Sequence, residues 1–382
     1  MAYILNIVSI EKCDSYSADE IRKAIERSYK NLGGLEKYIK KGDKVFLKAN
    51  LLKKNKPDDA VTTHPAIVEA VASTIKDMGA IPIIGDSPAG PFSERALRSI
   101  YETTGMIDVA KRTGAELNYN TEEIVVKISD GKLIKQATFM KALMECDSII
   151  SLPKLKTHGM TVYTGAVKNQ FGAIPGLVKA GYHLSMPDVK DFSDMLIDIN
   201  VFLKPVLSIM DAVIAMEGNG PSAGKPKKVG LIISSNDVFS LDTVATLIIG
   251  LNHEDAPTVF MAQRRGLGRF EDIKIIGMNI DDAKVSNFDI PTLRGFSVTE
   301  KIPPFLMKYL DKHVKPYPIF DYDVCKSCGI CVSNCPPKAL KMIDKKPIVD
   351  LKTCIRCFCC QELCPHKAVS IKKPHIAKLF YR

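Results

Sequence analysis

The chain has 382 residues, of which 46% are apolar and 25% are charged, and its formal net charge is +10. The length predicts two or more domains, and the composition is that of an ordinary globular protein. No apolar run reaches the roughly 18 residues of a membrane-spanning helix and no secretory leader is evident, so we expect a cytoplasmic protein without a transmembrane segment. The basic residues do not form a stripe interleaved with aromatic residues, which argues against a nucleic-acid partner.

Residues 1–290 alternate short β-branched runs with amphipathic helical patterns. This alternation predicts an α/β fold with layered helices and a mainly parallel sheet. Strands are expected at residues 4–10, 45–49, 81–84, 148–152, 206–210 and 229–233. Helices are expected at residues 18–30, 64–78, 93–101, 107–113, 189–203 and 241–249. We expect residues 1–290 to be the domain that binds a ligand or substrate.

The composition changes after residue 290, where five prolines lie between residues 291 and 318. This pattern predicts a semi-rigid linker over residues 291–317, with a short helix at residues 305–314. A C-terminal domain is expected at residues 318–382, ending in a basic tail. Residues 321–382 contain twelve Lys or Arg and five Asp or Glu, and we expect this positive charge to favour an acidic redox partner.

The segment between residues 325 and 365 contains an internal duplication. It reads CKSCGICVSNCP from Cys325 and CIRCFCCQELCP from Cys354, so both halves have the spacing C-x-x-C-x-x-C-x-x-x-C-P, with an offset of 29 residues. Three thiolates spaced in this way can hold three corners of an iron–sulphur cube, while the fourth cysteine binds the other cube. The spacing therefore predicts two 4Fe–4S clusters, one with Cys325, Cys328, Cys331 and Cys364 and one with Cys354, Cys357, Cys360 and Cys335.

Structural zinc and disulphide bonds are the alternatives for such a cysteine-rich segment. Zinc sites need neither the third cysteine in register nor the proline after the fourth. Disulphides belong to oxidising compartments, to which no signal in the sequence directs this chain. Cys359 falls outside the repeat and is predicted to be a packed thiol. Residues 318–373 resemble a bacterial two-cluster 4Fe–4S ferredoxin, which implies a ferredoxin-type domain.

Polar side chains follow several predicted strands at their carboxyl ends. Ligands of open α/β sheets bind beyond these ends, so we expect a polar crevice there for a small anionic molecule. Taken singly, each of these residues could instead be a turn or capping residue. The candidates are Lys48, Asn50, Asp86, Lys154, Lys156, His158 and Asp211, with Asn236 and Asp237 after the last of these strands.

Two glycine-rich stretches add further candidates. The first, GAVKNQFGAIPG at residues 165–176, contains Lys168 and Asn169, and its backbone amides could approach an anion. The second, EGNGPSAGKPKK, begins at Glu217 and could do the same or could form a long hairpin turn before a strand. Neither has the spacing of a Walker loop, so ATP hydrolysis is not indicated.

The motifs PKLKTH, GAVKNQFG and EGNGP, followed by the cysteine repeat, resemble the domain-of-unknown-function family 362. This likeness covers essentially the whole chain and implies an Fe–S centre protein without naming a substrate. A more distant likeness to lactate racemase is carried by His158, Lys168 and His183. In that family the lysine holds a nickel-pincer nucleotide and the histidines serve as metal ligand or acid/base, so the likeness implies those roles here. A second upstream pair of histidines is not evident, and His64 is the only upstream candidate.

The sequence therefore predicts an anaerobic-type iron–sulphur oxidoreductase. Its two clusters would relay low-potential electrons between a redox partner protein and an anionic substrate or cofactor held by lysines of the α/β domain. His158 and His183 are candidates for proton delivery, because the ordinary pKa of histidine lies near neutral pH, and Lys168 is the third candidate catalytic residue. Two alternatives stay open: a non-catalytic electron carrier or maturation partner, and a racemase-like enzyme with a lysine-bound cofactor.

Overall fold

The computed structural model describes residues 6–291, here called the α/β part, and residues 316–372, here called the cysteine module. Within the α/β part, ten strands form one sheet with the order β12-β1-β11-β10-β7-β2-β3-β4, to which β8 and β9 are attached beside β10. The sheet is mainly parallel, as predicted, and β11 is the strand that runs antiparallel to both of its neighbours. The strands are β1 (Asn6–Lys12), β2 (Lys44–Ala49), β3 (Ile81–Gly85), β4 (Glu116–Leu117), β7 (Ser148–Leu152), β8 (Lys154–His158), β9 (Val162–Thr164), β10 (Leu207–Glu217), β11 (Lys225–Ser235) and β12 (Ile273–Gly277), and a separate hairpin contains β5 (Glu123–Lys127) and β6 (Gln136–Met140).

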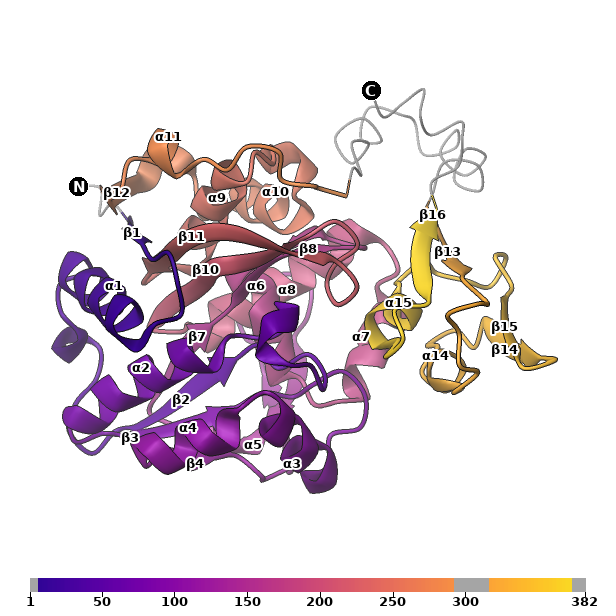
Figure 1. The fold of residues 1–382 in the computed structure, drawn as a ribbon, viewed down its shortest axis with the longest axis horizontal. Coiled ribbons are helices and arrows are strands. Elements are labelled where there is room, and N and C mark those ends of the chain that lie inside the picture. The colour runs from indigo at the N-terminus through magenta and orange to yellow at the C-terminus, as the bar shows by residue number, and fades with distance from the viewer. Residues whose placement is uncertain (1–5, 292–315, 373–382) are drawn as a thin grey trace.

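Helices cover both faces of this sheet (Figure 1). Because successive side chains of a strand point to opposite faces, Val45 and Leu47 of β2 enter one core and Phe46 enters the other. The first face is covered by α1 (Ala18–Asn31), α2 (Pro65–Asp77), α3 (Glu94–Thr103) and α4 (Met106–Thr113). The second is covered by α6 (Ala166–Asn169), α8 (Val189–Leu203), α9 (Val238–Ile248) and α10 (Pro257–Arg264). The other α-helices of the α/β part are α5 (Lys141–Met144), α7 (Val178–Ser185) and α11 (Ile280–Ala283).

Local capping signals explain why several helices form where they were predicted. Ser17 accepts a hydrogen bond from the backbone amide of Glu20 at the start of α1. His64 caps α2 through its ring nitrogen, and Pro65 occupies the first helical position. Asp188 caps α8, whose predicted bounds at residues 189–203 are confirmed.

Three expectations about the strands were wrong. The stretch PKLKTH, for which no strand was expected, contains β8, and its lysines are buried between neighbouring elements. Asp211, expected after its strand, lies inside β10, whereas Lys48 lies inside β2, within the predicted strand at residues 45–49. Asn236 and Asp237 do follow β11, but β11 runs antiparallel to β10, which places them at the opposite edge of the sheet.

The cysteine module repeats one pattern twice (Figure 1). Each half has a short helix beside its cysteines, and the module packs around Leu340, Ala368 and Val369. Its elements are β13 (Tyr317–Phe320), α14 (Ile330–Ser333), β14 (Leu340–Ile343), β15 (Lys346–Val349), α15 (Cys359–Leu363) and β16 (Val369–Lys372). The predicted helix at residues 305–314 and the tail after residue 372 lie outside the described residues. Among the helices of residues 6–291 and 316–372, none is both long and apolar enough to cross a membrane.

Candidate functional site

The duplication of the cysteine module extends to its backbone. Left-handed residues recur at matching positions of the two halves, as in Ser327 and Arg356 or Lys338 and Lys367. Gly329 occupies such a position in the first half, where glycine meets no steric penalty, and Phe358 occupies it in the second. The two halves therefore form the same tight loop from different residues.

Two cavities of the module each gather thiols from both halves of the repeat. The first cavity is lined by Cys325, Cys328, Cys331 and Cys364. The second is lined by Cys335, Cys354, Cys357 and Cys360, together with Cys359. All eleven cysteines of the chain are free of disulphide bonds. Within the described residues, no three His, Cys, Asp or Glu side chains are placed to hold a single metal ion.

A pocket of about 90 Å³ lies where the α/β part meets helix α15. This volume accommodates several water molecules or one small organic molecule. From the α/β part it is lined chiefly by Asn50, Asp86, Lys156, His158, Lys168, Asn169, Lys179 and His183. From the cysteine module it is lined by Asn334, Cys359, Glu362 and Leu363. The structure thus brings all three predicted catalytic residues to one cavity.

The loop between β10 and β11 holds the cysteine module against the pocket. The Gln361 amide nitrogen donates to the backbone oxygen of Asn219 at 2.9 Å, to its side-chain oxygen at 2.7 Å and to the Gly220 oxygen at 3.1 Å. Ser222 donates to the backbone oxygen of Glu362 at 2.9 Å. The stretch EGNGPSAGKPKK therefore forms the hairpin turn that was one of its two predicted structures, and this turn binds the module.

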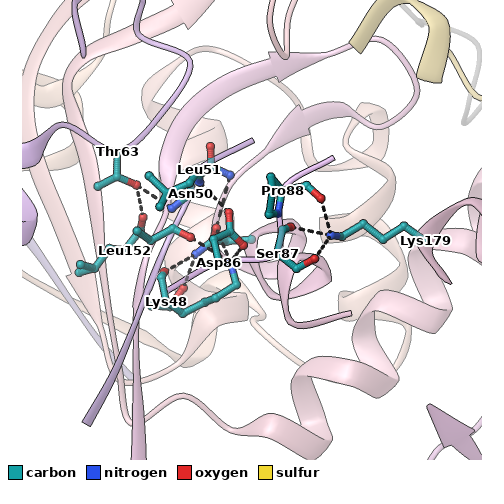
Figure 2. A network of polar contacts seen from close by, with 12 residues as sticks. Lys48, Asn50, Leu51, Thr63, Asp86, Ser87, Pro88, Leu152 and Lys179 are labelled. Atoms are coloured by element: carbon teal, nitrogen blue, oxygen red, sulfur yellow. Dashed lines mark hydrogen bonds and ion pairs between the residues drawn. The ribbon is translucent and has the colours of Figure 1, made fainter. Parts of the chain in front are cut away.

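Two lysines, Lys48 and Lys179, contact the residues that follow β3 (Figure 2). The Lys48 amine lies 2.6 Å from the Asp86 carboxylate, and both side chains are buried. Lys179 donates to the backbone oxygen and hydroxyl of Ser87 at 2.5 and 3.0 Å and to the Pro88 oxygen at 3.2 Å. Burial in the pocket wall lowers the pKa of Lys179 to about 7, because desolvation disfavours the charged amine.

Lys156 is the third lysine of this region that is anchored, meaning that protein oxygen atoms hold its amine by hydrogen bonds or an ion pair. Its amine donates to the Asn50 side-chain oxygen and to the Val61 backbone oxygen, both at 2.7 Å. Burial lowers the pKa of Lys156 to about 7. Asn169 stabilises the same wall by donating to the Lys48 backbone oxygen and the Ser151 hydroxyl, both at 3.0 Å.

The two pocket histidines are neutral at physiological pH. The Nδ1 atom of His158 accepts from the backbone amides of Met160 at 3.0 Å and Thr161 at 3.3 Å, so the ring proton lies on Nε2. Burial holds the pKa of His158 well below its ordinary value and lowers that of His183 to about 3. Neither histidine therefore has the near-neutral pKa that was expected for proton delivery. His158 instead presents a buried N–H donor whose nitrogen lies 3.9 Å from Glu362.

The first glycine-rich stretch binds an internal carboxylate with its amides. Asp242 accepts from the backbone amides of Ala166 at 2.7 Å and Val167 at 2.9 Å, so these two donors are occupied by the protein itself. A Cβ atom at Gly172 would clash with both the Asp86 carboxylate and the Lys48 amine. Close packing against this ion pair, rather than approach to an external anion, explains the glycine.

Five predicted binding residues do not line the pocket: Lys48, His64, Lys154, Asp211 and Glu217. Asp211 accepts from Lys154 and from Tyr16, both at 2.8 Å, and the ring of His64 stacks on Tyr16 with 3.6 Å between centroids. The side chains of Asp211, Lys154, Tyr16 and His64 form a separate network between β8, β10 and the residues that precede α1 and α2. Glu217, the last predicted residue, accepts from the Asp289 backbone amide at 3.0 Å near the end of β10.

Comparison with known proteins identifies the family. Residues 45–246 match the model described as Domain of unknown function (DUF362), which covers more than half of the chain. The chain belongs to this family. Residues 317–365 match the 4Fe-4S dicluster domain, so this DUF362 protein carries a domain that binds 4Fe–4S clusters.

Two curated proteins resemble this DUF362 protein. The thylakoid-associated protein sll1697 of Synechocystis sp. is 36% identical over 267 residues, covering 68% of this chain and 79% of its own length. The pyruvate synthase subunit PorD of Methanothermobacter marburgensis is 62% identical over 26 residues, covering 7% of this chain and 32% of its own length.

Two solved structures are similar in fold over part of the chain. The lactate racemase apoprotein from Thermoanaerobacterium thermosaccharolyticum has a TM-score of 0.38 at 11% identity and covers 62% of this chain. A protein from Thermotoga maritima has a TM-score of 0.35 at 12% identity and covers 59% of this chain. The matched parts span 55% and 56% of those two chains.

Sequence reasoning missed several pocket residues of this DUF362 protein. Lys179 lies on α7, far from any predicted strand end, and only its apolar neighbours Val178 and Ala180 hint at a buried position. Glu362 and Cys359 lie inside the cysteine repeat, where their only local signal is that they fall between cluster ligands. Their role in the pocket depends on how the module packs against the α/β part.

Proposed function

We propose that this DUF362 protein relays low-potential electrons through two 4Fe–4S clusters to a small anionic molecule bound in the pocket. The observation that carries this proposal is a shared wall: Cys359 lines both the second thiol cavity and the pocket. When bound, the clusters would supply one-electron transfer, with Cys325, Cys328, Cys331 and Cys364 holding one and Cys354, Cys357, Cys360 and Cys335 holding the other. In this proposal residues 1–290 and 318–382 act as separate domains joined by residues 291–317.

The order of electron transfer follows from the positions of the two cavities. The second cavity adjoins the pocket, whereas the first cavity is lined by Cys328, an exposed residue on the outer side of the module. Electrons from a partner protein would therefore enter at the first cluster and leave through the second. Low-potential electron transfer of this kind suits a cytoplasmic protein that works under anaerobic conditions. The proposal includes this location and these conditions.

The surface around the first cavity suits an acidic electron carrier. Exposed apolar side chains gather there, among them Tyr322, Met342 and Ile343. Four lysines lie in the same segments of the chain, and within residues 316–372 none of them forms an ion pair: Lys326, Lys341, Lys345 and Lys346. Unpaired cations around an apolar centre attract a partner of opposite charge and leave it an apolar surface to bury.

The pocket suits an anion because its polar groups are mainly donors. Lys156 and Lys179 supply positive charge, Lys168 supplies a further amine, and the His158 N–H is available as a neutral donor. Glu362 is the acidic residue that the module contributes, and Asp86 is neutralised by Lys48. A bound carboxylate or phosphate would therefore be held by charge-assisted hydrogen bonds in a site with little water.

Reoxidation kinetics test the proposal directly. Protein purified without oxygen should contain about eight irons per chain, and after reduction with dithionite its cluster absorbance should recover faster when a substrate anion is added. Replacing the two anchored lysines (K156M and K179M) should abolish this acceleration, whereas K111M on the exposed face of α4 should not. If the anion still accelerates reoxidation in K156M and K179M, the result would instead favour the non-catalytic electron carrier.

A further inference from the structure

The Lys168 amine differs from the other lysines near the pocket. Lys48, Lys156 and Lys179 each hold a carboxylate or backbone oxygens. Within residues 6–291 and 316–372, the Lys168 amine forms no hydrogen bond or ion pair. The amine lies over the ring of Phe171, 5.6 Å from the ring centre, and over that of Phe192, at 6.0 Å.

A lysine with this environment is set up as a nucleophile rather than as a structural cation. Burial lowers the pKa of Lys168, and the nearby Glu362 and Cys359 oppose this effect only in part. An amine in an apolar wall loses its proton more readily, and an uncharged amine attacks carbonyl carbon. An anchored lysine, by contrast, is held by its oxygen partners, because moving its ammonium group away would leave those oxygens without hydrogen bonds.

We propose that Lys168 forms a reversible imine with a small carbonyl compound that also carries a carboxylate, namely a 2-oxo acid. The Nζ atom bonds to the carbonyl carbon, the carbonyl oxygen leaves as water with the two amine hydrogens, and hydrolysis returns the free lysine. No oxidant or reductant is needed for this step. The inference rests on the proposed function, because the pocket is the same one, and it names the substrate class.

The rest of the pocket supplies what a 2-oxo acid needs besides an amine. Lys156 and Lys179 provide cations for the carboxylate at positions fixed by their own hydrogen bonds. His158 provides an unpartnered N–H, which can donate to the oxygen of the carbonyl group as the amine adds. The cavity volume of about 90 Å³ limits the ligand to a short chain, since a larger molecule would collide with Phe171 or Leu363.

Reductive trapping tests the imine. The full-length, cluster-loaded protein is incubated with glyoxylate or 2-oxobutanoate and with sodium cyanoborohydride, which converts an imine into a stable secondary amine. We expect one adduct per chain, mapped to Lys168 by peptide mass spectrometry, and its formation should be blocked by excess propionate. K168R keeps the charge and should lose the adduct, whereas K111R, on the exposed face of α4, should keep it.

The outcomes separate this inference from the proposed function. Iron content and circular dichroism of K168R first establish that the variant is folded and loaded. An adduct that persists in K168R, or that is spread over exposed lysines, overturns the imine. If no adduct forms but propionate still raises the unfolding temperature of the wild-type protein and not of K156M, the imine is overturned and the anion pocket stands. If neither binding nor trapping occurs, both the inference and the proposed anion site are overturned.

Discussion

The buried ion pair of Lys48 and Asp86 is the residue-scale feature on which the pocket wall depends. Both side chains are almost fully buried and their charged atoms lie 2.6 Å apart. The second Asp86 oxygen accepts from the Leu51 backbone amide at 2.6 Å, so the carboxylate also holds the chain after β2. Removing one partner of such a pair leaves the other charge without compensation in a region of low dielectric.

We therefore expect D86N to lower the free energy of unfolding by about 3–5 kcal/mol, because it leaves the Lys48 charge buried without a counter-charge. Urea denaturation of the cluster-loaded protein measures this loss. D19N removes an exposed carboxylate that pairs with Lys23 at the surface, and it should leave the unfolding midpoint unchanged. Equal, small effects of D86N and D19N would show that the buried pair does not stabilise the fold.

Anion affinity should fall as the pH rises through neutrality. The pKa values of Lys156 and Lys179 are lowered by burial to about 7, so both amines are protonated below that pH and lose their charge above it. Glu362 and Asp86 raise these pKa values, while Lys48, Lys154 and Lys168 lower them. A bound anion favours the charged lysines, so binding near pH 7 should take up protons.

Isothermal titration with oxalate between pH 6 and pH 9 tests this dependence. The affinity is expected to drop about 10-fold for each lysine that must be protonated per pH unit above its pKa. The single variants K156M and K179M should each bind more weakly and show a shallower slope. An affinity that stays constant over this range would contradict the role of the two amines.

At the scale of elements, local signals determined what could be predicted from the sequence. The helix at residues 189–203 was predicted correctly because its apolar stripe and its end before Pro205 are both local features of the sequence. The strand β8 was missed, since Lys154 and Lys156 are charged and only their burial against Asp211 and Asn50 makes a strand favourable. Partners 50 or more residues away cannot be read from a local pattern.

The contact between α15 and the β10–β11 loop holds the cysteine module against the α/β part. Q361A removes three hydrogen bonds to Asn219 and Gly220, and we expect it to lower the local opening free energy by about 1–3 kcal/mol. Hydrogen exchange of residues 218–224 should then be at least about 5-fold faster. Iron content should not change, because Gln361 is not a cluster ligand. Q136A, an exposed glutamine of β6, serves as the control and should leave this exchange unaltered.

At the scale of the whole molecule, the thiol sets were predictable and the pocket was only partly so. The spacing of the cysteines already implied that each set takes one member from the other half, and the two cavities have those members. Pocket residues at strand ends, such as Asn50 and Asp86, followed from the topology of parallel sheets. The closing wall from α15 could not be predicted, because it depends on contacts such as Gln361 with Asn219, which are 142 residues apart.

The crossed arrangement of the thiol sets leads to a prediction about pairs of substitutions. Cys335 belongs to the first half of the repeat but lines the cavity of Cys354, Cys357 and Cys360. If the sets are crossed, C335S and C357S damage the same cluster, so the double variant C335S/C357S should retain one intact cluster with about four irons. The double variant C335S/C328S should damage both clusters, because Cys328 lines the other cavity.

Iron and acid-labile sulphide analysis, together with electron paramagnetic resonance of the reduced proteins, distinguishes these two double variants. C359S is the matched control, since Cys359 lies in the same loop but outside both sets of four, and it should keep both clusters. Uncrossed sets would reverse the pattern: C335S/C328S would keep one cluster and C335S/C357S would lose both. Because each cluster needs a thiolate from both halves, the crossed arrangement also implies that neither half of the module can hold a complete cluster alone.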